Sequence, residues 1–410
     1  MRSQKRIIKK PLKAMKNNGA NTMQVMSYLS ELINAEIDNR TPEKIPENIT
    51  INQLYEIAVM SQMQGIIFSA LMRLDLSTEY NEKIKQLVMS SAMKSLAQLS
   101  LIKEMSKRLE ENKISHQVLK GAVLKGVYNN PVYREMGDID IMIYGEDIKR
   151  AEKIALQLGF ELKEVVGHHA IYVKKPYLVM EIHWTLFDKQ VDKNQYLYYK
   201  NSFRAKLTEG KSYTYEFEKE DFYVYMVSHM AKHFYETGCG IRNLLDIYVY
   251  LEKYKNEIDT DVIAGELSKL GLVDFEKHIK KLAYIWILKE ECPKFYLDLF
   301  DYMLDCGIYG KGENGVWGQL AKESRINNNS IDEKNIKRIY WFPSRERMKE
   351  QYPWVEKSIL LLPIAWLVRI VKGITKKERI RRYKAIAKDS SKQMEKMLTI
   401  YETLNLKFRR

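Results

Sequence analysis

Two aspartates separated by a single residue, Asp138 and Asp140, are the residues whose type and spacing indicate chemistry most directly. Side chains alternate along a β-strand, so both carboxylates would lie on one face, about 6.6 to 6.8 Å apart along the chain. Ile139, Ile141 and Ile143 would anchor the opposite face. Mg²⁺ prefers oxygen ligands and commonly shares one or two carboxylates with substrate phosphates. The alternative is an edge strand on which the two aspartates only form a solvated face.

A third acid, Glu181, stands alone in an apolar run from Val179 to Trp184 that predicts another strand. A carboxylate in such surroundings is costly unless it is paired, protonated or bound to a metal. A neighbouring strand could therefore deliver Glu181 as a third metal ligand or as a general base.

Basic residues near the aspartates add the features of a phosphate site. Leu119-Lys120-Gly121 predicts a strand that ends at a glycine before a helix, and backbone N–H groups at a helix start can hold phosphate. Lys120, Lys125 and Arg134 supply cations within the same segment, as a triphosphate requires, although long cationic side chains often only cover apolar surface. Together with the acids, these residues predict a site for a nucleoside triphosphate.

The segment from about Ile114 to Leu186 resembles a bacterial family of nucleotidyltransferases within the DNA polymerase beta superfamily. The resemblance rests on Leu119-Lys120-Gly121, Tyr128, Pro131, Arg134, Asp138-Ile139-Asp140 and Glu181-Ile182-His183-Trp184. It extends more loosely to the run from His229 to His233, Arg242, Asp246, Phe342-Pro343-Ser344 and Tyr352-Pro353. The superfamily's glycine signature is usually Gly-Ser or Gly-Gly, whereas this chain has Lys120-Gly121-Ala122.

The resemblance implies a small mixed sheet of the polymerase-beta type and an enzyme that depends on Mg²⁺ or Mn²⁺. By resemblance, Asp138, Asp140 and Glu181 are the catalytic residues and the metal ligands. The implied reaction is in-line attack of an acceptor hydroxyl on the α-phosphate of an NTP, with release of pyrophosphate. The family does not define the acceptor, so a small molecule, a protein side chain and an RNA end are all open. The residues that we expect to contact the nucleotide are Lys120, Gly121, Lys125, Arg134 and His233.

His229 and His233 stand four residues apart on a predicted helix and so share one face. This spacing can seat zinc, but the glutamate of a metalloprotease HExxH motif is absent, because positions 230 to 232 are Met, Ala and Lys. The helix could instead cross the cleft and bring a histidine or Lys232 to a nucleotide or acceptor, and ordinary partly buried histidines are the remaining alternative. His168, His169 and His183 have two similar alternatives, since they could line the cleft or form hydrogen bonds within the sheet.

The elements that must position these residues form an α+β fold that is mostly helical. Apolar residues at three- and four-residue steps predict a helical region over 23–110, after a basic disordered tail over 1–22. Residues 111–210 alternate between strand and helix patterns and are the predicted nucleotidyltransferase core. Helical periodicity returns over 211–308, which we expect to pack on the core. Residues 309–410 form a loop and a basic, helical C-terminal region.

The composition is that of an ordinary folded protein, which excludes wholesale disorder and collagen-like repetition. The 410 residues are 45% hydrophobic and 29% charged, and they suffice for two or three domains. The net charge of +14 is concentrated at the ends, because residues 1–30 carry seven basic and no acidic residues and residues 369–410 carry fourteen basic and four acidic ones. A nucleic-acid-binding face would spread this charge over its surface.

Three widely spaced cysteines, Cys239, Cys292 and Cys306, form no CxxC pair, which favours a reducing compartment and argues against a cysteine zinc site. The N-terminus lacks the apolar core of a secretory signal, and the longest apolar run, 359–368, is too short to span a bilayer. We therefore predict a cytoplasmic protein. Basic residues follow this run, so the C-terminal region could contact anionic lipid or an RNA backbone, or could be a core helix that leads into a solvated one.

The predicted function is a metal-dependent nucleotidyltransferase. One alternative keeps the fold without the chemistry, as a nucleotide-binding or scaffolding protein, and another is an RNA-binding protein. Convergence of Asp138, Asp140 and Glu181 favours catalysis, whereas a Glu181 that turns away favours binding only. Basic ends that form one stripe with the cleft would favour RNA.

Overall fold

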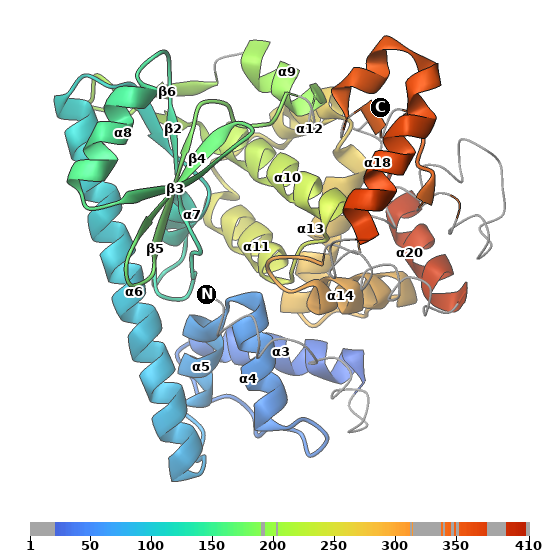
Figure 1. Ribbon diagram of the computed structural model, residues 1–410. Coiled ribbons are helices and arrows are strands. Elements are labelled where there is room, and N and C mark those ends of the chain that lie inside the picture. The colour runs from blue at the N-terminus through green and yellow to red at the C-terminus, as the bar shows by residue number, and fades with distance from the viewer. Residues whose placement is uncertain are drawn as a thin grey trace.

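The computed structural model describes residues 21–189, 193–201, 204–311, 314, 338, 341–345, 348–349, 352–374 and 391–406. Over these residues the predicted fold class is confirmed, since the chain is mostly helical and contains a seven-stranded mixed sheet. Figure 1 shows the sheet between the long helix α6 and a body of helices that includes α10, α11 and α13. The predicted tail lies outside the described residues except for its last two.

Four helices precede the sheet in the region expected to be helical: α3 (Thr22–Ile37), α4 (Ile51–Ser61), α5 (Gln64–Leu71) and α6 (Thr78–Glu111). Asn21 and Thr50 each begin a helix with a capping box, in which the cap side chain and a glutamine three residues on satisfy backbone N–H groups reciprocally. These polar residues stand directly before apolar runs and explain where α3 and α4 begin.

The sheet has the order β3-β4-β5-β2-β1-β7-β6. Its strands are β1 (His116–Val118), β2 (Ile139–Ile143), β3 (Glu161–Val166), β4 (His169–Lys174), β5 (Leu178–His183), β6 (Ala205–Leu207) and β7 (Thr214–Phe217). The central strands β2 and β5 are parallel, and their register places Asp140 opposite Glu181. Strands β4 and β5 are antiparallel, with His169 opposite His183. Because β7 pairs with β1, the sheet continues beyond residue 210, where we expected the core to end.

The two faces of β2 belong to different hydrophobic cores. Ile139, Ile141 and Ile143 are buried in a core shared with α6 and α8 (Ile148–Gln157). Met142, on the other face, belongs to a larger core. This core is built mainly from helices that precede the sheet in the sequence and helices that follow it. The predicted alternation along β2 therefore leaves Asp140 on the face that is turned towards the helical body.

The remaining described helices either cover that face of the sheet or come later in the chain. Two short or peripheral ones are α7 (Gly121–Val127) and α9 (Lys193–Asn201). The helical body consists of α10 (Lys219–Glu236), α11 (Arg242–Tyr254), α12 (Thr260–Leu270), α13 (Val273–Ile287) and α14 (Lys294–Cys306). These helices lie within residues 211–308, which also contain strand β7. The last helices in the described part of the chain are α18 (Leu362–Ile374) and α20 (Ser391–Thr403), preceded by the 3-10 helices η1 (Pro353–Lys357) and η2 (Ile359–Leu361).

The C-terminal helix α20 returns to the helical body. Tyr401 contacts the Tyr302 hydroxyl at 3.1 Å and donates a hydrogen bond of 2.9 Å to the backbone carbonyl of Phe234. Most of the expected loop over 310–329 and the basic stretch over 375–390 lie outside the described residues. Among the described helices, none combines the length and the apolarity that a membrane span needs.

Candidate active site

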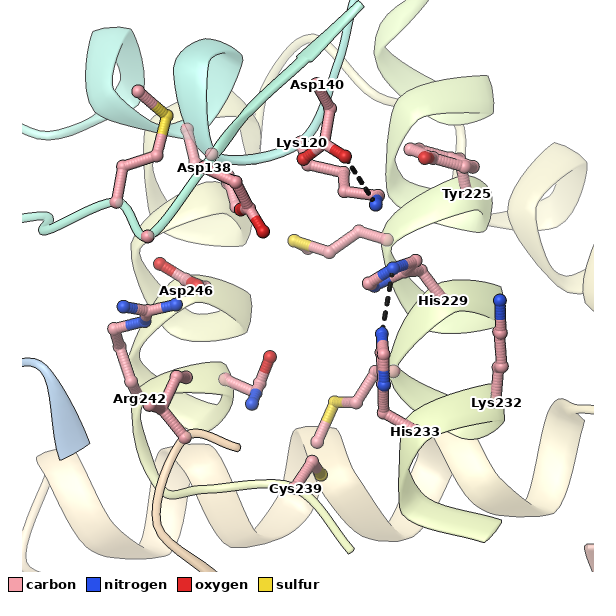
Figure 2. A pocket seen from close by; sticks show the side chains of 18 of the residues that line it. Lys120, Asp138, Asp140, Tyr225, His229, Lys232, His233, Cys239, Arg242 and Asp246 are labelled. Atoms are coloured by element: carbon pink, nitrogen blue, oxygen red, sulfur yellow. Dashed lines mark hydrogen bonds and ion pairs between the residues drawn. The ribbon is translucent and has the colours of Figure 1, made fainter. Parts of the chain in front are cut away.

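A cavity of about 370 Å³ lies between the sheet and helices α10 and α11. Figure 2 shows Asp138, Asp140 and Lys120 facing His229 and Tyr225 of α10, with Arg242 and Asp246 of α11 nearby. The lining also includes Glu181, His168, His169 and His183 from the sheet and Gln62 from the N-terminal helices. The predicted site residues that line it are Lys120, Gly121, Arg134, Asp138, Asp140, Glu181 and His233.

The three acids reach the cavity from two neighbouring strands. Asp138 immediately precedes β2, Asp140 is the second residue of β2, and Glu181 lies on β5 directly opposite Asp140. Asp140 is only 3% exposed, while Ile139 and Ile141 on the opposite face are fully buried. The parallel register of β2 and β5 brings together acids that are far apart in the sequence.

Asp140 is the most heavily contacted of the three acids. Its Oδ1 accepts hydrogen bonds from Lys120 Nζ at 2.9 Å and from His183 Nε2 at 2.8 Å. Burial alone would raise the pKa of this carboxyl, but the Lys120 ammonium and the His183 ring hold the pKa well below its usual value. Asp140 is therefore ionised, and its second oxygen, Oδ2, receives no hydrogen bond from the described residues.

Asp138 has the opposite electrostatic environment. Burial, followed by the charges of Asp140 and Glu181, raises the pKa of Asp138 from 3.8 to about 6. No hydrogen bond or ion pair within the described part of the chain reaches its carboxylate. A half-buried carboxylate that faces two other acids without a direct cationic partner fits a site for a divalent cation, which would relieve the repulsion.

Glu181 turns towards the other acids. Its Oε2 lies 3.5 Å from His183 Nε2 and 3.6 Å from His169 Nε2. Burial, the largest influence, raises the pKa of Glu181, but His183 and the charge of Lys120 together outweigh it and leave the pKa below the ordinary value. One donor atom each from Asp140, Glu181 and His183 lie within 4.8 Å of one another. Because His183 Nε2 faces both acids and donates to Asp140, the two carboxylates are the members of this group that could hold a metal ion.

Lys120 occupies an unusual backbone conformation. Its φ of 47° and ψ of −114° lie outside the backbone regions that residues other than glycine favour. Such strain is concentrated at functional sites. The next residue, Gly121, opens α7, where a Cβ atom would lie 2.9 Å from Met136 Cγ and 3.0 Å from Arg134 Nη1. The close packing explains a glycine at 121, and the preceding Lys120 sends its ammonium to Asp140.

The other predicted phosphate ligands are largely committed to the protein itself. Arg134 lines the cavity, but its guanidinium binds Asp246 through two hydrogen bonds, from Nε to Oδ1 at 3.1 Å and from Nη2 to Oδ2 at 3.0 Å. Lys125 is fully buried and does not line the cavity. Its ammonium donates to Ser95 Oγ at 2.6 Å and to the carbonyl of Pro131 at 3.1 Å. In that position Lys125 cannot reach a ligand in the cavity.

The histidines of α10 share one face of the helix, as their spacing predicts, and contact one another. Their Nε2 atoms lie 3.0 Å apart. Burial lowers the pKa of His233 to about 3 and lowers that of His229 well below 6.5, so both rings are neutral. Among the described residues, neither ring belongs to a group of three potential metal ligands. This arrangement fits a cavity wall better than the zinc site that the spacing alone allowed.

Gln62 and Tyr225 are among the lining residues that the sequence-based prediction did not name. Gln62 closes α4 in a left-handed conformation, and its side chain accepts from Arg242 Nη1 at 2.7 Å and donates to the Tyr309 hydroxyl at 2.7 Å. Tyr225 lies on α10 beside the carboxylates. Gln62 is far from the acids in the sequence and lies in a helix end of ordinary composition, so no local signal could have identified it.

Together, the mixed sheet and the acidic cavity define an α+β protein whose site is suited to a cation. Residues 47–287, more than half of the chain, match a family model described as an uncharacterised nucleotidyltransferase, and the protein belongs to this family. The match includes every described strand of the sheet and helices α10 and α11, and therefore all of the cavity lining except Ile308 and Tyr309. No curated protein and no solved structure matches the chain.

Proposed function

We propose that the protein is a metal-dependent nucleotidyltransferase that moves a nucleoside monophosphate from an NTP to an acceptor hydroxyl and releases pyrophosphate. Family membership supports the class of reaction. The observation that carries the proposal is Asp138, a half-buried acid whose pKa is raised by burial, Asp140 and Glu181, and which faces the cavity without a direct cationic partner. A site that concentrates negative charge in this way is built to receive cations together with a polyanion.

Asp138, Asp140 and Glu181 are the residues that would hold Mg²⁺ or Mn²⁺. Such ions, when bound, neutralise phosphate charge and stabilise the attacking and leaving oxygens of an in-line displacement. Lys120 keeps Asp140 ionised and adds a positive charge at the cavity wall. The neutral His229 and His233 line the opposite wall and offer hydrogen bonds without adding charge.

The proton of the acceptor hydroxyl moves to Glu181 in this proposal. The hydroxyl oxygen forms a bond to the α-phosphorus, and the bond from that phosphorus to the bridging oxygen of the β-phosphate breaks. Glu181 is ionised, because His183 and the charge of Lys120 together offset the effect of burial and keep its pKa low, and so it can accept a proton. The acceptor carries its hydroxyl on a small molecule, a protein side chain or an RNA end.

The test is transfer of label from each α-labelled NTP in the presence of Mg²⁺ or Mn²⁺ and a lysate that contains candidate acceptors. We expect Asp138→Asn to abolish the transfer, while Asp261→Asn, an exposed position on α12, leaves it unchanged. Equal transfer by wild type and Asp138→Asn would remove the basis of the enzymatic proposal.

A non-catalytic nucleotide-binding or scaffolding protein is the second candidate function, and the Lys120–Asp140 ion pair favours it. This pair already neutralises one of the acids from within the chain. The two functions differ in one measurement, because a binding protein retains labelled nucleotide at equilibrium without releasing pyrophosphate.

The C-terminal surface supports an additional peripheral contact with anionic lipid. Four apolar residues of η2 and α18 follow one another at steps of three and four and are between 51% and 81% exposed: Leu360, Ile364, Leu367 and Val371. Residues 369–410 carry fourteen basic side chains. An exposed apolar helix face beside basic sequence suits the interface of an anionic bilayer better than an RNA backbone, which offers no apolar partner.

A further inference from the structure

Three histidines gather at one end of the β4–β5 hairpin. His168 lies in the turn before β4, His169 is the first residue of β4, and His183 is the last residue of β5. The ring centroids lie 4.9 Å apart for His168 and His169, 4.9 Å for His169 and His183, and 5.6 Å for His168 and His183. One nitrogen from each ring lies within 4.8 Å of the other two.

The hydrogen bond between His183 and Asp140 decides which nitrogen of His183 is available. A carboxylate oxygen only accepts, so the Nε2 atom, 2.8 Å from Asp140 Oδ1, carries the proton. In the neutral ring the lone pair is then on Nδ1. This atom is buried, as is the whole residue, which is only 3% exposed. It has no hydrogen-bond partner within the described part of the chain. A histidine that donates one N–H to a carboxylate and keeps the other nitrogen bare has the arrangement of a metal ligand.

His169 shares the bare Nδ1 atom with His183 but not the hydrogen bond to a carboxylate, because its nearest carboxylate oxygen is too far away. Its Nε2 faces Glu181 Oε2 at 3.6 Å, and its Nδ1 is buried without a hydrogen-bond partner among the described residues. Leaving a buried polar atom unpaired costs about 1 to 3 kcal/mol. One ion bound between these adjacent rings would satisfy both atoms.

We propose that His168, His169 and His183 form a zinc site at the edge of the cavity. Three histidines are an established ligand set for Zn²⁺, whereas Mg²⁺ requires oxygen ligands, so imidazole nitrogens select the transition metal. Asp140 orients the His183 ring through a hydrogen bond from Nε2, and Glu181 lies 3.6 Å from Nε2 of His169. The site is distinct from the carboxylate site proposed for Mg²⁺ and does not depend on nucleotidyl transfer.

The position of the cluster suggests what zinc would do for the fold. His169 and His183 are direct partners in the β4–β5 ladder, and His168 extends the cluster into the preceding turn. A metal bound to all three would join the start of β4 to the end of β5 beside the acids. Because zinc binds the folded state in this way, it should raise the melting temperature of the protein.

The experiment is a titration of the metal-free full-length protein with Zn²⁺ by calorimetry, without nucleotide and in the presence of excess Mg²⁺. We expect one tightly bound zinc per chain. His168→Gln and His169→Gln should each weaken zinc binding by about tenfold or more. His278→Gln is the matched control, because His278 lies on α13 and contacts Tyr296 rather than the cluster. Co²⁺ in place of zinc should give visible d–d bands without a thiolate charge-transfer band, since the cluster contains no cysteine.

Asp138→Asn separates this site from the proposed Mg²⁺ site. We expect this variant to bind zinc like the wild type, because Asp138 is not part of the histidine cluster. Unchanged zinc affinity in both His168→Gln and His169→Gln, with far-UV circular dichroism that shows folded protein, would overturn the proposal. Loss of zinc in Asp138→Asn, or its displacement by Mg²⁺, would overturn it too and would assign the ion to the carboxylates. Neither result bears on nucleotidyl transfer, which is measured separately.

Discussion

Lys120 Nζ lies 2.9 Å from Oδ1 of Asp140, and it does so from a backbone position with a φ of 47°. The lysine therefore combines a conformation that suits glycine with a side chain that neutralises an acid of the cavity. The strain in the backbone and the ion pair occur at the same residue, so substitutions can separate the two.

Lys120→Gly and Lys120→Ala both remove the ammonium, but only glycine relieves the positive φ. We expect Lys120→Gly to be more stable than Lys120→Ala by about 1 kcal/mol in urea denaturation. Since Asp140 loses the same partner in both variants, the difference between their stabilities measures the cost of the backbone conformation alone. Equal stabilities would show that Lys120 is not strained.

The Arg134–Asp246 pair is the buried connection between the loop before β2 and α11. Asp246 also accepts a hydrogen bond from the Tyr128 hydroxyl at 2.8 Å. We expect Asp246→Asn to lower the free energy of unfolding by about 3 to 5 kcal/mol, because it leaves the Arg134 guanidinium buried without a counter-charge. Arg134→Met combined with Asp246→Leu should recover most of this loss. The account would be contradicted if the double variant lost as much free energy of unfolding as Arg134→Met and Asp246→Leu lose separately when their losses are added.

Lys125 makes stability depend on pH above neutrality. Burial, and then the charge of Arg134, lowers the pKa of Lys125 from 10.5 to about 8. A lysine whose pKa is depressed on folding stabilises the protein most above its unfolded pKa, and this stabilisation is lost as pH falls through 8. We expect the wild type to gain about 2 kcal/mol between pH 7.5 and pH 9.5 relative to Lys125→Met. Parallel pH profiles of the two proteins in urea denaturation would show that Lys125 keeps an ordinary pKa.

The apolar face of α18 should bind anionic vesicles. Leu360→Ser combined with Leu367→Ser should lower the partition coefficient for phosphatidylserine-containing vesicles by about tenfold or more, because two exposed leucines lose their apolar transfer energy. The control is Leu156→Ser, at a position on α8 that is 48% exposed. Co-sedimentation measures the effect. Binding to RNA but not to vesicles would replace lipid by nucleic acid as the partner.

Local pattern was sufficient for the elements that carry the acids. Side chains alternate along any strand, so the sequence around Asp140 predicted both a carboxylate on one face and isoleucines in the core on the other, as the structure has them. The helical regions before and after the sheet follow from apolar periodicity, and the capping residues mark where α3 and α4 begin. These features depend on neighbours within a few residues.

Pairings between distant segments were decided only by the tertiary structure. The register of β2 against β5 places Glu181 opposite Asp140, and that of β4 against β5 places His169 opposite His183. The roles of the cations could not be predicted either, because a lysine or arginine is defined by the partner it meets. Asp246 on α11 binds the Arg134 side chain, and Lys125 is buried away from the cavity. An ion in a protein interior needs a counter-charge or hydrogen-bond acceptors, and only the fold decides which residues supply them.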